Sequence, residues 1–220
     1  RYGIKRISDD DFPFTSRLIR ELHKILMDGV RGQHKTPGEF RYTQNFIGGT
    51  MPSNAIYVPP AVHRLPNLVS DLDRFLNNMD NLPILIKLAF LHYQFETIHP
   101  FLDGNGRTGR LIIPLFLLSS KEISKPCFYI SNYFEEHKDE YYSKLQRVRT
   151  HSEIIPWIKF FLTGVSITAQ NSAYTLKNII DLRTSCEKMI LNDFGKRAAT
   201  GIDLLHFLFS KPIISSRAIQ

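Results

Sequence analysis

The chemically distinctive part of this sequence is the twelve-residue segment 99–110, which reads HPFLDGNGRTGR. A Gly-Asn-Gly turn before a helix lets backbone N–H groups converge at the helix start, where free donors and the helix dipole attract anions. Arg107 and Arg110 are three residues apart on that helix, so both side chains can reach the same anion. Because two guanidinium groups at one helix start repel each other, the pattern favours a highly charged ligand such as a polyphosphate.

The same segment holds groups suited to phosphate chemistry. Asp103 offers a carboxylate for Mg²⁺, which usually binds to one or two carboxylates plus phosphates. His99 titrates near neutrality and can take a proton from an attacking hydroxyl, and Pro100 keeps it out of helical geometry. Phe101 is expected to anchor the loop by burial. Taken singly, these residues fit a structural histidine, a turn or a helix cap, but their occurrence within twelve residues favours a functional site.

Helical periodicity on both sides of this segment predicts the elements that position it. Helices are expected at residues 15–30, 69–76, 82–95, 107–120, 135–148, 154–168 and 174–191. Residues 82–95 and 107–120 are apolar nearly all round, which is typical of buried helices, and Pro114 predicts a kink in the second. We therefore predict a mainly α fold, a helical bundle around a central buried helix pair.

Residues 32–66 are rich in proline and glycine and contain two short β-prone pieces, 45–47 and 55–58. This pattern predicts a small β-hairpin flap, since long ordered loops are often functional lids. We divide the chain into an N-terminal helical segment at 1–35, a flap region at 36–66, a core with C-terminal helices at 67–195, and the beginning of another domain at 196–220.

Composition excludes several classes of protein. The 220 residues carry 28 Lys and Arg against 21 Asp and Glu, a net charge of +7, with 43% hydrophobic residues, as in a soluble globular protein. No apolar run approaches the ~20 residues of a membrane span, and we expect no signal peptide. The two distant cysteines form no CxxC pair, which argues against a zinc site and favours a reducing, cytoplasmic location. The basic residues are spread out rather than gathered in a nucleic-acid footprint.

Segment 99–110 resembles the HPFx(D/E)GNGRxxR signature of the Fic (filamentation induced by cyclic AMP) family and matches it at every specified position. Gly38-Glu39-Phe40-Arg41 and residues 45–49 and 58–60 resemble the region before and through the flap of that family. The resemblance extends over about residues 15–195 and implies a Fic-type helical bundle. Residues 209–212 resemble the opening of the winged-helix domain that follows many bacterial Fic cores.

The resemblance implies a protein adenylyltransferase (AMPylator), which transfers AMP from Mg-ATP to a Ser, Thr or Tyr hydroxyl of a target protein and releases pyrophosphate. It implies that His99 is the general base and that Asp103 holds Mg²⁺. The nucleotide-binding residues that it implies are Phe101, Gly104, Asn105, Gly106, Arg107, Thr108, Gly109, Arg110, Tyr141 and Tyr142. The flap residues that would pair with an extended target segment are Ala55, Ile56, Tyr57 and Val58.

The resemblance also implies regulation, because family members often carry an inhibitory helix with the pattern [S/T]xxxE[G/N]. None of the nine glutamates is followed by Gly or Asn, so we expect that segment before Arg1 or on a separate, antitoxin-like protein. Self-modification and a homodimer are further expectations. Two alternatives stay open: a DNA-binding regulator with a winged-helix tail and a nucleotide-sensing core, and a Fic enzyme that uses UTP or CDP-choline. The intact Gly-Asn-Gly-Arg argues against phosphate transfer of the Doc type.

Overall fold

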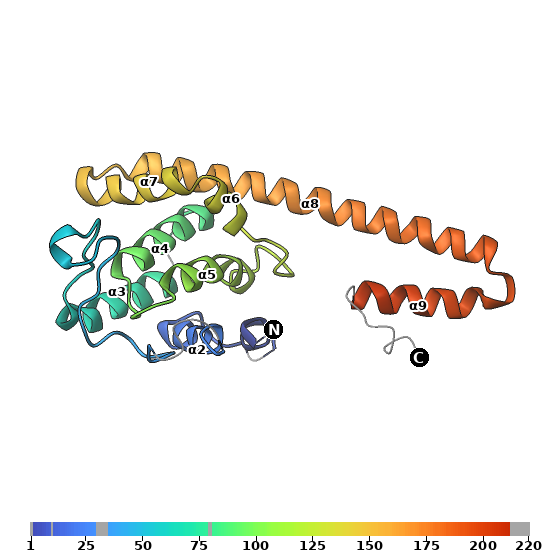
Figure 1. Cartoon of the computed structure of the whole chain (residues 1–220), viewed down its shortest axis with the longest axis horizontal. Coiled ribbons are helices and arrows are strands. Elements are labelled where there is room, and N and C mark those ends of the chain that lie inside the picture. Colours follow the sequence, from blue (N-terminus) through green and yellow to red (C-terminus); the bar gives the residue numbers. More distant parts are fainter. Residues whose placement is uncertain (1, 10, 30–34, 79–80, 212–220) are drawn as a thin grey trace. The chain divides into compact units, whose positions relative to one another are not determined.

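A computed structural model describes residues 2–9, 11–29, 35–78 and 81–211 of the chain. The described residues form nine α-helices and three short 3₁₀-helices (Figure 1). The α-helices are α1 Tyr2–Ser8, α2 Ser16–Leu26, α3 Leu65–Asn77, α4 Ile84–Ile98, α5 Asn105–Ser119, α6 Ser131–Glu136, α7 Lys138–His151, α8 Ile154–Asp193 and α9 Ala198–Ser210. The 3₁₀-helices are η1 Pro52–Asn54, η2 Val62–Arg64 and η3 Gly195–Arg197. The predicted mainly α fold is confirmed.

The chain divides into two compact units, Arg1–Thr168 and Ala169–Gln220. In the first unit, α4 and α5 lie side by side at the centre, with α3 against α4 and with α1 and α2 against α5 (Figure 1). The predicted central pair of buried helices is therefore present. Its core residues include Leu88, Leu91, Phe95, Ile112 and Ile113, all at most 1% exposed. α5 continues past Pro114 without a break.

The beginning of α8 and the helix α7 cover α4 on another side. The indole Nε1 of Trp157 donates a hydrogen bond of 3.0 Å to the backbone oxygen of Ala89. The predicted helices at 154–168 and 174–191 are one helix, α8. The prediction of two separate helices was wrong. The residues between them include neither Gly nor Pro, so nothing in the sequence forces the helix to end there.

The flap region forms one antiparallel bridge, between Ile47 and Tyr57, which joins the two predicted β-prone pieces. The backbone N–H of Ile47 donates to the backbone oxygen of Tyr57 at 2.8 Å, and the N–H of Tyr57 donates to the backbone oxygen of Ile47 at 3.1 Å. The hairpin does not extend further in the described residues. Pro52 and Pro59 near the bridge cannot donate ladder hydrogen bonds, which limits its length.

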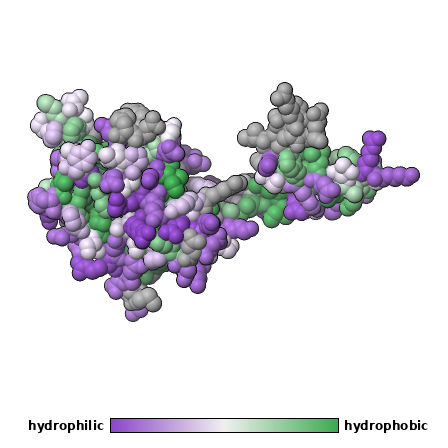
Figure 2. Space-filling model, turned by 90° about the horizontal axis from the view of Figure 1, so that it is seen from below, coloured by the Kyte–Doolittle hydropathy of each residue, from purple (hydrophilic) through white to green (hydrophobic). Residues whose placement is uncertain are grey.

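The second unit holds the rest of α8, η3 and α9. Apolar side chains are exposed along this helical hairpin, and Figure 2 shows hydrophobic residues on its surface. They include Leu176, Ile179, Ile180, Leu182, Met189 and Leu191. The predicted winged-helix beginning at 196–220 reaches into residues 212–220, which lie outside the described part of the chain. Within that part, no helix is both long and apolar enough to cross a membrane.

Candidate active site

Two residues in left-handed conformation shape the loop between α4 and α5. His99 ends α4 with φ 49° and ψ 60°, and its N–H donates to the oxygen of Phe95 at 2.9 Å. Gly104 precedes α5 with φ 77°. A Cβ on Gly104 would lie 2.6 Å from the sulfur of Met27 and 3.1 Å from Nε2 of His23, so both the conformation and the space require glycine.

The interior of the loop is held by side-chain hydrogen bonds. The Asn105 amide brackets the backbone of Phe101, accepting from its N–H at 2.9 Å and donating to its oxygen at 2.8 Å. The Phe101 ring is fully buried and stacks on His23, with 3.7 Å between ring centroids. His23 accepts from the N–H of Gly38 at Nδ1, so its Nε2 carries the proton and donates to the oxygen of Asp103 at 2.9 Å. These contacts fix the path of the loop before any ligand binds.

Side chains of the segment fall on two faces. Gly106, Arg107 and Arg110 are partly exposed at the start of α5, and the Asp103 carboxylate next to them is 42% exposed. Nη2 of Arg107 lies 3.9 Å from Oδ1 of Asp103. The structure thus places Asp103 and the beginning of α5 where a charged ligand has access.

The other predicted nucleotide-binding positions of this segment face the interior. Thr108 is fully buried, and Gly109 is buried where α5 approaches α4 closely. The side chains of Phe101 and Asn105 likewise stabilise the loop from inside. This division follows helical spacing, because positions 105, 108 and 109 share one face of α5 while 106, 107 and 110 lie on the other.

The two tyrosines predicted to bind the nucleotide, Tyr141 and Tyr142, lie in different surroundings. Tyr141 is buried among aromatic rings, 4.5 Å from the ring of Phe134, and its hydroxyl lies 2.9 Å from Nε2 of His92. Nδ1 of His92 lies 3.2 Å from the oxygen of Gly109, so this nitrogen carries the proton and the hydroxyl donates to Nε2. Tyr141 therefore belongs to the core that joins α4, α5 and α7. Tyr142 is 52% exposed.

His99 is neutral at neutral pH. Burial lowers the pKa of His99 to about 4, and the guanidinium groups of Arg149 and Arg41 act in the same direction. The backbone oxygen of Glu96 and the carboxylate of Asp103 oppose that lowering of the pKa. Nδ1 of His99 is buried and has no hydrogen-bond partner among the described residues. The imidazole is therefore a free base, able to accept a proton.

Glu96 was not predicted as a site residue, although it lies one turn before His99. Its Oε2 is 3.9 Å from Nδ1 of His99, and its buried Oε1 has no hydrogen-bond partner in the described parts of the chain. Burial raises the pKa of Glu96 to about 7, against the opposing effect of Arg110 and Arg149. An acidic residue directly after the mostly apolar segment 82–95 was an available signal in the sequence.

Arg41 and Arg149 are two further residues that the sequence analysis did not assign to the site. Arg41 is 2% exposed, and its Nε donates to the oxygen of His99 at 3.0 Å. Arg149, on α7, donates from Nη2 to the oxygen of Glu96 at 3.2 Å. Neither residue belongs to the 99–110 segment, and no sequence spacing relates them to it.

The flap contributes one inward and two outward side chains next to this helix end. The Tyr57 hydroxyl donates to the oxygen of Thr97 at 2.8 Å. Ile56 and Val58, on either side, are 69% and 44% exposed. Ala55 is half-buried. The alternation is that of a β-strand, and it leaves the side chains of Ile56 and Val58 exposed.

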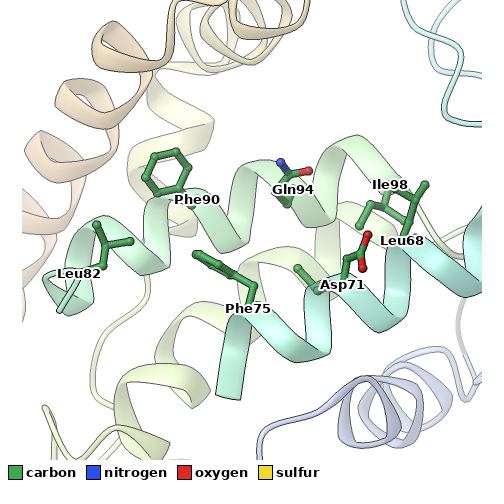
Figure 3. Close-up of a pocket in the computed structure, with 8 residues that line it drawn as sticks. Leu68, Asp71, Phe75, Leu82, Phe90, Gln94 and Ile98 are labelled. Atoms are coloured by element: carbon green, nitrogen blue, oxygen red, sulfur yellow. The ribbon is translucent and has the colours of Figure 1, made fainter. Parts of the chain in front are cut away.

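A separate apolar pocket of about 350 Å³ lies between α3 and α4 (Figure 3). Phe75 and Phe90 line it, and Asp71 and Gln94 are its polar residues. None of the predicted site residues lines this pocket, although it reaches Ile98, the residue before His99. The pocket is therefore separate from the candidate site formed by the 99–110 segment.

Comparisons with known proteins agree on one family. Residues 13–117 match the Fic/DOC family. A protein adenylyltransferase Fic from Culex quinquefasciatus is 32% identical over 160 residues, which are 70% of this chain and 28% of that protein. One from Aedes aegypti is 31% identical over the same shares of the two chains. The chain thus spans less than a third of these curated relatives.

Solved structures show the same fold. The crystal structure of a Fic family protein from Desulfovibrio desulfuricans G20 matches with a TM-score of 0.64 and 26% identity, over 79% of this chain and 51% of that one. A Fic-domain protein from Bacteroides thetaiotaomicron matches with a TM-score of 0.59 over 78% of this chain and 69% of that one. At 21% identity, this second likeness concerns the fold alone.

Proposed function

Since the chain belongs to the Fic/DOC family through the domain at residues 13–117, we propose that it is a protein adenylyltransferase. It transfers AMP from ATP to a Ser, Thr or Tyr hydroxyl of a target protein. The observation that carries this proposal is the arrangement of the 99–110 segment, in which a neutral, partly buried His99 lies one loop away from Arg107 and Arg110. The names of relatives that are 31–32% identical support the same reaction.

In this proposal the beginning of α5 binds the polyphosphate. The backbone N–H groups of residues 104–106 and the side chains of Arg107 and Arg110 neutralise the phosphates. They also stabilise the negative charge that develops on pyrophosphate as it leaves. The partly exposed, accessible positions of both arginines are consistent with this role.

His99 acts as the general base. The target hydroxyl oxygen attacks the α-phosphorus and forms a new P–O bond, while the bond between the α-phosphorus and the bridging oxygen of pyrophosphate breaks. The hydroxyl proton passes to Nε2 of His99, because Nδ1 is buried on the protein side. A histidine that is neutral at pH 7 is ready for this step, and the enzyme itself forms no covalent intermediate.

Asp103 is the residue that would hold Mg²⁺. Its carboxylate is 42% exposed and lies next to the helix start that would bind the phosphates, which fits an ion that takes one or two carboxylates together with phosphate oxygens. The ion would supply charge neutralisation between the phosphates. The described residues contain no cluster of three or more His, Cys, Asp or Glu that could hold a metal alone, so the phosphates would complete its coordination.

Ile56 and Val58 of the flap would contact the target. A target segment in extended conformation beside residues 55–58 would present its hydroxyl for in-line attack. The exposure of both side chains supports this placement. The target is thus recognised first by its backbone and by apolar side chains that flank the modified residue.

The test is labelling with ATP that carries ³²P at either the α or the γ position, in the presence of Mg²⁺. We expect label from α-ATP alone to enter the protein itself or an added target. His99→Ala should lower the transfer rate by about 10²- to 10⁴-fold while ATP binding is retained. His151→Ala, on the exposed end of α7, is the matched control and should transfer normally.

Other outcomes would contradict the proposal. Label from γ-ATP would show phosphoryl transfer instead. Transfer of UMP from UTP or phosphocholine from CDP-choline in the same assay, with no transfer from ATP, would show a different donor. Full activity of His99→Ala would refute its role as the base.

A further inference from the structure

The carboxyl end of α4, which carries His99, is capped by side chains from three distant segments. Nη2 of Arg149 on α7 donates to the oxygen of Glu96 at 3.2 Å. The hydroxyl of Tyr57 in the flap donates to the oxygen of Thr97 at 2.8 Å. These two carbonyl groups belong to the last turn of the helix and have no partner within it.

Arg41 contacts the backbone oxygens of the next two residues, Ile98 and His99. Its Nε donates to the oxygen of His99 at 3.0 Å, and Nη2 lies 3.5 Å from the oxygen of Ile98. Nη2 also donates to the oxygen of Pro60, two residues after the flap residues 55–58, and the Arg41 backbone N–H donates to the oxygen of Pro100 at 2.8 Å. One guanidinium group thus connects the His99 loop with the base of the flap.

Within the described part of the chain, the local backbone leaves carbonyl groups at this helix end without a donor. Helices commonly finish with backbone N–H groups that fold back onto the last carbonyls, but the residue after His99 is Pro100, which has no N–H to donate. Cations at the carboxyl end also interact favourably with the helix dipole. Side chains from elsewhere therefore do here what the local backbone cannot.

Both arginines contact backbone oxygens and neutral side chains. In the described residues, no Asp or Glu oxygen lies within ion-pair distance of Arg41 or Arg149. Arg149 instead contacts Thr97 Oγ1 at 3.3 Å and lies over the ring of Tyr57, with 3.7 Å from its guanidinium carbon to the ring centroid. Burying a guanidinium group against carbonyls and a ring costs desolvation energy, which points to a gain in positioning.

We propose that Arg41, Tyr57 and Arg149 form a helix cap that positions His99 and couples it to the flap. They are positioning residues, and the proposal rests on the proposed function, in which His99 is the base. Tyr57 lies between Ile56 and Val58, the two flap side chains open to a target. A target segment that orders the flap therefore also orders Thr97, two residues before His99.

Tyr57→Phe tests the cap with the smallest change, since only the hydroxyl is lost and the ring over Arg149 remains. We expect kcat for AMP transfer to fall about fivefold to tenfold, with the dissociation constant of ATP unchanged within about twofold. The matched control is Tyr174→Phe, because Tyr174 is 68% exposed on α8. An unchanged kcat for Tyr57→Phe, or an equal loss in the control, would overturn the proposal.

Arg149→Met and Arg149→Lys separate charge from geometry. The groups that face His99 are Glu96 at the end of α4, Asp103 in the loop, Arg41 near the start of the flap region, and Arg149 on α7. Because the Arg149 cation lowers the pKa of His99, Arg149→Met should raise that pKa, and the acid limb of kcat/KM should move to higher pH. Arg149→Lys should keep the pKa low and still lose kcat, because an ammonium group cannot reproduce both contacts of the guanidinium.

The pKa of His99 is read directly by NMR, with its imidazole signal assigned through His99→Ala. This readout does not depend on activity, so the cap is tested even where the wild-type chain transfers no AMP and the proposed function fails. Arg147→Met, an exposed position on α7, is the control for removing a cation. A His99 pKa that is the same in Arg149→Met, Arg147→Met and the wild type would refute the cap.

Discussion

Glu96→Gln is the substitution whose effect on stability follows most directly from the structure. The buried carboxyl lies against Gly109, and its Oε1 has no hydrogen-bond partner among the described residues. Burial raises its pKa from 4.5 to about 7. A shift of about 2.5 units corresponds to about 3 kcal/mol between the charged and the neutral form. Glutamine has nearly the shape of the protonated acid and never ionises.

The sign of the pH dependence follows from proton binding. Between pH 4.5 and 7 the folded protein keeps a proton on Glu96 that the unfolded chain has released. The free energy of unfolding of the wild type therefore falls as pH rises through this interval, and levels off once the carboxyl is ionised in both states. His99, whose pKa is lowered, gives the opposite slope, but it is present in both proteins and cancels on subtraction.

Urea unfolding of wild type and Glu96→Gln from pH 4 to pH 8 measures the difference. We expect the stability of the variant relative to wild type to rise by about 3 kcal/mol from pH 4 to pH 8. Glu135→Gln, which removes a carboxylate that is 77% exposed on α6, shows the background effect of losing a surface acid. A relative stability that stays constant with pH, or that falls, would refute a protonated Glu96 in the folded protein.

Two more substitutions test how the loop and α5 are held. Gly109→Ala places a Cβ against the Glu96 carboxyl and should lower the free energy of unfolding by about 1–3 kcal/mol, with most of the loss recovered in the double variant with Glu96→Ala. Asn105→Ala removes both hydrogen bonds to the Phe101 backbone and should cost about 2 kcal/mol and weaken ATP binding. Thermal unfolding and calorimetric titration with ATP check both, and an Asn105→Ala protein that binds ATP like the wild type would show that the loop needs no such support.

Helical periodicity predicted the central pair correctly because most residues of both helices are apolar and most are buried, and an apolar segment of that kind has few alternatives in a protein of this size. Helix boundaries were less predictable. α4 extends to Ile98, beyond the predicted residue 95, because the polar Glu96 and Thr97 are accommodated by buried contacts with α5, α7 and the flap. Such contacts come from tertiary structure, which local sequence does not encode.

The sequence also could not show which of two adjacent tyrosines is buried. Tyr141 and Tyr142 are adjacent, so α7 directs them about 100° apart, and only one can face the core. The sequence left both as candidates, and the structure buries Tyr141 against His92. For α5, helical spacing alone is enough to predict which positions face the interior, since it places Thr108 and Gly109 on a different face from Arg107 and Arg110.

The residues that the sequence did not reveal share one property. Arg41, Glu96 and Arg149 are ionisable groups that lie in or near the interior around the end of α4. Among the described residues, none of the three has a fully charged ion-pair partner that would mark it in the sequence. Their contacts with the backbone of residues 96–100 join positions more than 50 residues apart, such as Arg149 with Glu96 and Arg41 with His99.

The candidate site therefore consists of two sets of residues, one from within the 99–110 segment and one from distant parts of the chain. Groups that would meet the phosphates follow one another within 99–110 because a helix start gathers them locally. The protonation state of His99 depends instead on burial and on two arginines from elsewhere in the chain. Substitutions in the first set should change nucleotide binding, whereas substitutions in the second should change the pH dependence and kcat at nearly constant ATP affinity. We therefore expect that a Fic/DOC domain with the whole 99–110 segment but without cations at positions 41 and 149 would bind ATP normally and transfer AMP slowly. Its histidine would be free to turn away from the target and would take up a proton at a higher pH.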